Sequence, residues 1–169
     1  NTPALRSFVF LIVSIIIIMS SLIKTADKSV ANLPILKKNM GGDIYYGYTE
    51  DWTNFLKLSR YCGDSLPETA YVVSRKAPMS FIYSNGKSFY PIYTVPSTDP
   101  DSVLALLKEN KVTHVLIASL RRNPKKNDGY VINTLHRMMG PVGQKYPDKL
   151  KLVKQVGTSE PSYLYEIKY

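Results

Sequence analysis

The chain has 169 residues, of which 44% are hydrophobic and 21% charged, a composition that excludes a disordered tail and allows one ordinary domain with its own core. The formal net charge of +9 favours anionic partners such as phosphates, anionic lipids, acidic glycans or nucleic acid. Because Cys62 is the one cysteine in the sequence, an internal disulfide is excluded.

An apolar run without a charge covers residues 8–23, FVFLIVSIIIIMSSLI, and we predict a transmembrane helix or anchor over residues 1–23. As an α-helix, these 16 residues measure about 24 Å at about 1.5 Å per residue, somewhat less than the roughly 30 Å of a bilayer core. A signal peptide that begins at Arg6 is the second interpretation, although no small-x-small cleavage site stands near Ser20 and Ser21. A buried core helix is disfavoured because no face of the run is polar.

The cations that flank this run bear on its orientation. Arg6 precedes it, and four lysines follow it, namely Lys24, Lys28, Lys37 and Lys38. By the positive-inside rule, this asymmetry places the following residues in the cytoplasm. The sequence opens on Asn1 rather than Met, so we expect a longer protein, whose upstream cations would enter the same count.

Residues 24–48 are predicted to be a polar connector of mixed helix and loop, and residues 49–169 a soluble α/β domain. The first element of this domain is an amphipathic helix over residues 49–61, with Thr49 as its cap and Gly63 as its end. The elements predicted after it are, in chain order, strand 71–74, a short helix from Pro78 to Asn85-Gly86, strand 88–95, helix 99–110, strand 112–120, helix 129–139 and a hairpin of strands 150–156 and 163–168.

Local signals set several of these bounds. Asp99 caps the helix that Pro100 opens. Pro91, inside a strand pattern, predicts an edge strand or a bulge. Residues 140–141, Gly-Pro, are expected to stop the helix before them. The apolar run VTHVLIASL over residues 112–120 is typical of a strand in the middle of a parallel sheet.

Strands that alternate with helices predict an α/β fold. We expect three layers, with a mostly parallel sheet, helices on both faces and an antiparallel C-terminal hairpin, preceded by the hydrophobic N-terminal helix. In such a sheet, ligands bind beyond the carboxyl ends of the strands.

Two basic pairs follow predicted strands. Arg75 and Lys76 come after the first strand, and Arg121 and Arg122 after the third, with Lys125 close behind. If those strands are neighbours, the cations gather at one edge and form a phosphate or carboxylate site, in which a guanidinium can bind two oxygens at once.

Three tyrosines could complete this site by stacking on a sugar or a lipid edge, namely Tyr83, Tyr90 and Tyr93. The alternative is that the cations are solvated loop residues, neutralised in part by Asp99, Asp101 or Asp128, and that the tyrosines are ordinary strand aromatics.

The sequence offers no complete catalytic site. His114 lies in an apolar strand and is expected to be a core residue, whereas His136 is expected to be exposed. We find no metal-ligand spacing, no nucleophile elbow and no phosphate-loop glycines, and we therefore predict no catalytic residue, no metal and no cofactor for this chain.

A series of landmarks resembles the C-terminal extracytoplasmic domain of bacterial multi-pass glycosyltransferases, the superfamily of protein O-mannosyltransferases and lipid A aminoarabinose transferases. The landmarks are the last hydrophobic helix, DWTNFLKLSRY at residues 51–61, SRKAPMSFIYSNGKSFYPIY at 74–93, VTHVLIASLRRNP at 112–124 and EPSYLYEI at 160–167. The sharpest of them is the RK-x-P pattern followed by aromatic-x-x-S-x-G. The match spans most of residues 50–169.

The resemblance implies an inner-membrane enzyme that transfers a sugar from a polyprenyl-phosphate donor to an extracytoplasmic acceptor. Its catalytic acidic residues would lie in a loop between early transmembrane helices, so this chain would be an accessory periplasmic domain that is not catalytic alone. Its expected partners are the upstream transmembrane domain of the same polypeptide, the polyprenyl-phosphate sugar and anionic lipid headgroups, with no nucleic acid. This periplasmic placement opposes the one that the flanking lysines favour.

Two other functions stay open from the sequence. A stand-alone, membrane-anchored module could bind an anionic glycan or a protein partner, and what precedes Asn1 would distinguish it from the enzyme. A nucleic-acid binder fits the charge, but the apolar anchor opposes it and no recognised module is present.

Overall fold

The computed structural model describes residues 3–169, which divide into two compact units on either side of the bond between Gly47 and Tyr48. The first unit is dominated by one long helix, and the second holds the strands and the remaining helices.

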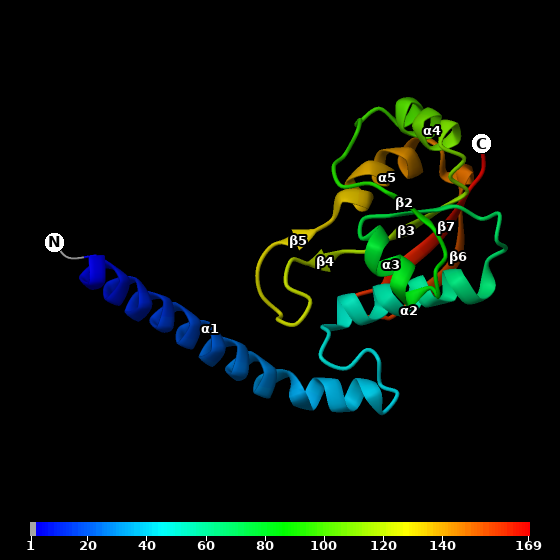
Figure 1. Ribbon diagram of the computed structural model, residues 1–169. Helices are drawn as coiled ribbons and strands as arrows, with labels where there is room; N and C mark the ends of the chain where they lie inside the picture. Colours follow the sequence, from blue (N-terminus) through cyan, green and yellow to red (C-terminus); the bar gives the residue numbers. More distant parts are fainter. Residues whose placement is uncertain (1–2) are drawn as a thin grey trace. The chain divides into compact units, whose positions relative to one another are not determined.

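The helix of the first unit, α1, runs from Pro3 to Met40 (Figure 1). It contains the predicted apolar run and continues over the stretch that was expected to mix helix and loop. Residues 24–40 are rich in Ala, Leu and Lys, which are strong helix formers, and Pro34 is accommodated inside the helix. The apolar part has a mean hydropathy of 2.4 and none of it is buried. This helix is long and apolar enough to anchor the protein in a membrane.

The second unit is built on a five-stranded sheet with the order β2-β1-β3-β7-β6. Its strands are β1 (Val72–Ser74), β2 (Phe89–Pro91), β3 (His114–Ile117), β6 (Leu150–Val156) and β7 (Ser162–Ile167). β1 pairs in parallel with both β2 and β3, whereas β7 is antiparallel to β3 and β6. Four strands therefore run in one direction, and the predicted mostly parallel sheet with a C-terminal hairpin is confirmed.

Helices cover both faces of this sheet (Figure 1). α2 (Glu50–Ser65) and α3 (Ala77–Tyr83) lie on one face, and α4 (Pro100–Glu109) and α5 (Thr134–Lys145) lie on the other, followed by the short 3-10 turn Pro147–Lys149. Alternate strand residues serve the two layers: Val73 and Val115 join the core under α4 and α5, so Val72 and Leu116 point toward α2. All four side chains are fully buried or nearly so.

The first helix of this unit is longer than predicted. It begins after Thr49 as expected, but it passes through Gly63 and ends at Ser65. A Cβ atom at Gly63 would lie 1.9 Å from the carbonyl oxygen of Ser84, so this glycine permits a close approach between α2 and the end of α3. The residue that looked like a helix stop is a packing residue.

The predicted strand 112–120 is interrupted. β3 ends at Ile117, and the chain then forms β4 (Leu120–Arg121), which pairs with β5 (Val131–Ile132) in a separate two-stranded sheet. This hairpin, which we call the β4–β5 hairpin, takes residues 131–132 out of the helix that was expected to start at Gly129.

The helix that follows, α5, also runs past its predicted stop. Gly140 and Pro141 lie inside it, and it ends at Lys145. Val142 is fully buried beside Met138 in the core under α4 and α5. Burial of this last turn outweighs the helix-breaking tendency of the Gly-Pro pair.

Both edges of the five-stranded sheet are protected. β2 is three residues long and contains Pro91, in agreement with the predicted edge position. β6 carries the exposed Lys151 and Lys154, and its register with β7 shifts between Leu152 and Lys154. Short strands, proline, lysine and register irregularities all hinder the addition of another strand.

Candidate anion-binding site

The carboxyl ends of β1 and β3 meet at one edge of the sheet, because the two strands are parallel neighbours with Val72 opposite His114 and Val73 opposite Val115. The condition that the sequence set for bringing the two basic pairs together is therefore met. The cation pair that follows β1 is the centre of the candidate site, and the cations that follow β3 are compared with it below.

A chain of buried hydroxyl groups fixes the backbone at the end of β1. Ser74, Ser80 and Ser59 come from β1, α3 and α2, and none of the three side chains is exposed. The Oγ atoms of Ser74 and Ser80 lie 2.9 Å apart, and those of Ser80 and Ser59 lie 3.0 Å apart. The backbone N–H of Lys76 donates to Ser74 Oγ at 3.2 Å. These contacts lock the turn that carries Arg75 and Lys76.

Arg75 is held between a helix and a tyrosine ring. Its Nε donates to Oγ1 of Thr134, the first residue of α5, at 3.2 Å. Its guanidinium carbon lies 5.3 Å from the centroid of the Tyr93 ring, within range of a cation–π contact. The two terminal nitrogens of the guanidinium remain for a ligand, because the Thr134 contact uses Nε.

Lys76 rests on an indole ring. Its Nζ lies 5.6 Å from the ring centroid of Trp52, which is buried in α2. Partial burial lowers the pKa of Lys76, and the neighbouring charge of Arg75 lowers it further. Within the described residues 3–169, no carboxylate forms an ion pair with Arg75 or Lys76.

Arg121 has the opposite environment. It forms ion pairs with Glu160 and with Asp51, whose Oδ1 lies 3.2 Å from Arg121 Nη1. Its backbone N–H donates to Asp51 Oδ2 at 2.6 Å, and its carbonyl accepts from Trp52 Nε1 at 2.8 Å. The hydrogen bond to Glu160 and the charge of Asp51 raise the pKa of Arg121. We call Asp51, Arg121 and Glu160 the carboxylate–arginine triad.

The triad links the N-terminal part of the second unit to its C-terminal part. It joins the start of α2, strand β4 and the turn before β7, and Asp51 is almost completely buried. Two of the three carboxylates expected to neutralise cations are engaged elsewhere: Asp99 caps α4 through the Ser102 N–H, and Asp101 pairs with Lys145. Arg121 is thus a structural cation.

The remaining basic residues lie on the exposed β4–β5 hairpin. The guanidinium of Arg122 lies 5.7 Å from the Tyr130 ring centroid, and the backbone N–H of Lys125 donates to Asn123 Oδ1 at 3.0 Å. Both side chains are exposed. They form a basic loop rather than part of the compact pair at the end of β1.

Of the three tyrosines, the structure brings Tyr93 to the cation pair, where it is 53% exposed. Tyr90 packs edge-on against Tyr71, with ring centroids 6.0 Å apart. Tyr83 packs edge-on against Tyr48, and its hydroxyl donates to the Tyr48 hydroxyl at 3.3 Å.

The candidate site therefore consists of Arg75, Lys76, Tyr93, Thr134 and Trp52. The last two escaped sequence reasoning. Thr134 lies inside the predicted helix 129–139, and Trp52 lies inside the predicted amphipathic helix 49–61, so neither position stands out in the sequence. The contact between Trp52 and Lys76 cannot be predicted from local sequence patterns, because the two residues are 24 positions apart.

Two hollows lie near the sheet but do not contain the cation pair. One, of about 280 Å³, is lined by Ser119, Arg121, His136, Glu160 and Tyr163, among others. His136 is half-buried there rather than exposed, and burial lowers its pKa. Its Nδ1 lies 3.4 Å from Ser119 Oγ. Among residues 3–169, no group of His, Cys, Asp and Glu is arranged to hold a metal ion.

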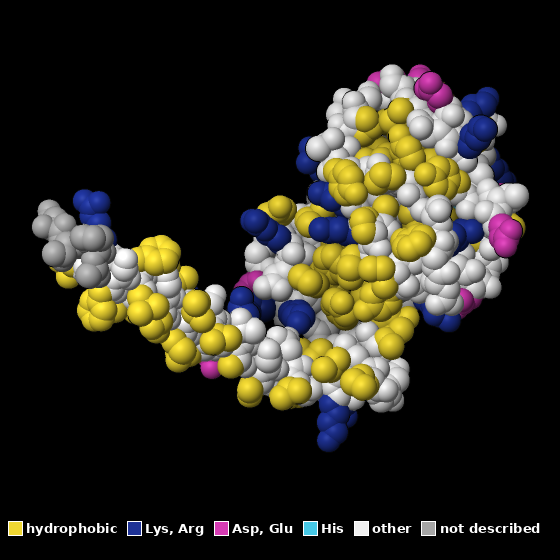
Figure 2. Space-filling view, in the orientation of Figure 1, with side chains coloured by type: hydrophobic (Ala, Val, Ile, Leu, Met, Phe, Trp, Pro, Cys, Tyr) yellow, Lys and Arg dark blue, Asp and Glu magenta, His cyan; other side chains and the backbone are white. Residues whose placement is uncertain are grey.

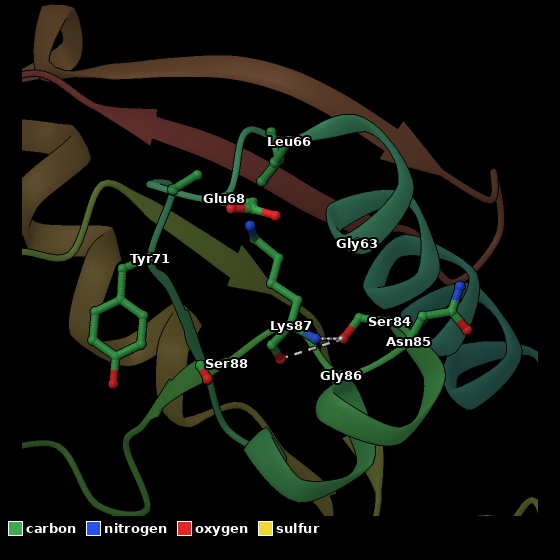
Figure 3. A pocket seen from close by; sticks show the side chains of 10 residues that line it. Gly63, Leu66, Glu68, Tyr71, Ser84, Asn85, Gly86, Lys87 and Ser88 are labelled. Atoms are coloured by element: carbon green, nitrogen blue, oxygen red, sulfur yellow. Dashed lines mark hydrogen bonds between the residues drawn. The ribbon is translucent and has the colours of Figure 1, made fainter.

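The other hollow, of about 520 Å³, lies at the opposite, amino end of β1 and β2 (Figure 3). Lys87 extends across it toward Glu68, and its Nζ donates to the carbonyl of Pro67 at 2.8 Å. The backbone N–H of Lys87 also donates to Ser84 Oγ at 3.1 Å. The Lys87 side chain and the turn at residues 84–87 thus line this hollow, which is separate from the candidate site.

Comparison of the sequence with protein families finds no match, and comparison with curated proteins finds none either. Among solved structures, the chain is similar to the C-terminal globular domain of an oligosaccharyltransferase from Archaeoglobus fulgidus, with 12% sequence identity and a TM-score of 0.42. The similarity covers 71% of this chain and 98% of that domain. It is a loose similarity.

Proposed function

We propose that residues 48–169 form an accessory domain of an integral-membrane glycosyltransferase, in which Arg75 and Lys76 bind the phosphate of a polyprenyl-phosphate sugar donor. The domain lies on the extracytoplasmic side of the membrane, and the catalytic residues belong to the membrane-embedded part of the same polypeptide. The choice of glycosyl transfer rests on the sequence landmarks described above and on the apolar helix α1.

One observation supports the anion site: Arg75 and Lys76, at the end of β1, contact the aromatic rings of Tyr93 and Trp52 instead of carboxylates. Arg121, in contrast, forms ion pairs with two carboxylates, those of Asp51 and Glu160, and has a structural role. Leaving two adjacent positive charges unpaired costs repulsion energy, which a bound anion would relieve.

The geometry suits a phosphate group. The terminal nitrogens of Arg75 can bind two phosphate oxygens at once, Lys76 supplies a second charge, and the hydroxyl of Thr134 orients the guanidinium. The exposed ring of Tyr93 offers a face on which the sugar or the isoprenoid chain can stack.

The direct test is binding of polyprenyl phosphate to the purified chain in detergent, with the uncharged polyprenol as the reference ligand. The double variant Arg75→Ala/Lys76→Ala is expected to bind the phosphate at least tenfold more weakly, since each lost charge-assisted hydrogen bond is worth about 1.5–3 kcal/mol. Lys151→Ala/Lys154→Ala, which removes the same charge from the exposed strand β6, is the matched control and should bind as the unchanged chain does.

Equal affinity of both double variants would overturn the phosphate site. Sugar transfer by residues 24–169 alone would overturn the accessory role. A third measurement addresses the parent protein: an antibody to the second unit should detect, in native membranes, a band far above 19.1 kDa that resists salt washing.

One observation favours a second candidate, a membrane-anchored module that binds an anionic glycan. Tyr93 is exposed beside Arg75, and an aromatic face next to a cation suits a sugar that bears a carboxylate or sulfate. A native band near 19.1 kDa and preference for an acidic oligosaccharide over polyprenyl phosphate would select this function.

A further inference from the structure

Helix α3 presents an apolar face to solvent. Phe81 and Ile82 are 48% and 65% exposed, and Pro78 precedes them on the same side of the helix, at positions i, i+3 and i+4. The opposite side of the helix, with Ala77 and Ser80, is buried. Figure 2 shows hydrophobic side chains gathered over α3, with Lys and Arg side chains beside them.

The chain segment that contains this face is basic, although the Asp64 carboxylate of α2 lies 3.5 Å from Asn85 Nδ2 just after α3. Residues 69–98 contain Arg75, Lys76 and Lys87 and no aspartate or glutamate. Arg75 and Lys76 precede α3 and place two cations at its N-terminal end, whereas Lys87, which follows the helix, is directed toward Glu68 and donates to the Pro67 carbonyl. Such a face complements the interface of an anionic bilayer, where negatively charged headgroups cover the apolar acyl chains.

A short segment joins the second unit to the apolar helix. The apolar run ends at Ile23, and the second unit begins at Tyr48, so a tether of 24 residues joins them, of which residues 24–40 continue α1 as helix. A short tether gives the second unit a high effective concentration at the membrane surface, and weak contacts then suffice for docking.

We propose that α3 docks on the surface of the membrane that α1 enters, with Phe81 and Ile82 in the interfacial region and Arg75 and Lys76 at anionic lipid headgroups. This inference goes beyond the proposed function and does not depend on glycosyl transfer. Docking would place Arg75 and Lys76 at the depth of lipid phosphates.

The test is spin labelling of the full chain reconstituted in vesicles, with a cysteine introduced by Ile82→Cys. Cys62 does not compete for the label, because it is fully buried and burial raises the pKa of its thiol to about 12. The matched control is Leu152→Cys, since Leu152 is an equally apolar, 49% exposed residue on the edge strand β6. Vesicles contain phosphatidylcholine alone or equal parts of phosphatidylcholine and phosphatidylglycerol.

With phosphatidylglycerol present, the label at position 82 should become several-fold less accessible to a water-soluble nickel complex while it stays accessible to oxygen, which partitions into lipid. The label at position 152 should remain open to the nickel complex in both lipid mixtures. Adding Phe81→Ser should return position 82 toward the behaviour of position 152, and the fluorescence of the buried Trp52 verifies that each variant is folded.

Equal accessibility at positions 82 and 152 in both mixtures would overturn the proposal. Shielding of position 82 from both reagents, whatever the lipid, would show that a protein surface covers α3 and would also overturn it. Insertion that is the same with and without phosphatidylglycerol would overturn the role of the cations.

Discussion

Two arginines of the second unit, Arg75 and Arg121, have different partners and therefore different roles. Arg121 has a buried carboxylate partner and a second, partly exposed one, whereas Arg75 has a threonine hydroxyl and a tyrosine ring. Removing one partner from a buried charge network leaves the other groups desolvated and unpaired, which is more costly than never forming the network. We therefore expect substitutions around Arg121 to affect stability, and substitutions of Arg75 and Lys76 to affect binding.

Asp51→Ala should lower the free energy of unfolding by about 1–3 kcal/mol, because it removes the acceptor of the Arg121 N–H and leaves that donor without a partner. Chemical denaturation measures the change. Asp64→Ala is the control, since its ion pair with Arg60 is exposed and should contribute about 0.2–1 kcal/mol. If the two variants lose the same stability, the triad is not a structural centre.

Phosphate binding should depend on the ionisation of Lys76. Burial and the charge of Arg75 lower the pKa of Lys76 below 10.5, so affinity for polyprenyl phosphate should fall as the pH rises through that lowered value. Lys76→Arg should keep its affinity in the same alkaline range, because guanidinium stays charged. Titration of the binding affinity against pH for both proteins tests this, and identical profiles would remove Lys76 from the site.

The same shift affects stability with a definite sign. Between the lowered pKa and 10.5, the unfolded chain binds a proton at Lys76 that the folded chain has released. The contribution of Lys76 to the free energy of unfolding therefore rises with pH in that window.

At the scale of elements, the contact between α2 and α3 depends on a residue without a side chain. Gly63 lets the Ser84 carbonyl approach α2, and the serine chain of Ser59, Ser80 and Ser74 then links both helices to β1. The position of the cation pair follows from this packing, because Lys76 is hydrogen-bonded to the last member of the chain.

Gly63→Ala should destabilise the second unit by about 1–3 kcal/mol, since the new methyl group would overlap the backbone of Ser84 and force α2 and α3 apart. Gly140→Ala is the matched control in α5, where nothing lies within 4 Å of the new Cβ. It should stabilise the unit by about 0.5–1 kcal/mol, because alanine favours helix more than glycine does. Thermal unfolding compares the two, and a stable Gly63→Ala variant would contradict the close approach.

The elements that the sequence predicted well carry local signals. Asp99 and Pro100 mark the start of α4, Pro91 marks an edge strand, and the alternation of residues 150–168 marks the hairpin. These signals act through neighbouring residues, so they can be recognised without the rest of the fold.

The elements that were predicted wrongly depend on distant contacts. Gly63 acts on Ser84, and the last turn of α5 persists beyond Pro141 because Val142 is buried in the core. The candidate site shows the same division. The position of Arg75 and Lys76 after a strand was readable from the sequence, whereas Thr134, Trp52 and the partners of Arg121 come from elements that only the folded chain brings together.

At the scale of the whole molecule, the chain consists of a membrane-competent helix and a unit with its own core. Limited proteolysis within residues 41–48 should release a fragment that retains the thermal midpoint of the second unit, because the sheet, its four helices and the triad all lie within residues 48–169. Mass spectrometry and thermal unfolding of the fragment check this. A lower midpoint after cleavage would show that the first unit contributes to the stability of the second.

The position of β7 has a consequence for how this unit is made. β7 is the last strand in the sequence, yet it lies inside the sheet between β3 and β6, and the turn before it supplies Glu160. While a ribosome is still adding these residues, the earlier strands have no partner on that side, so the sheet cannot close. The nascent segment therefore cannot complete its sheet until β7 has been synthesised. We expect a chain that ends before Ser162 to remain open and sensitive to proteases, because β3 and β6 then lack their common partner.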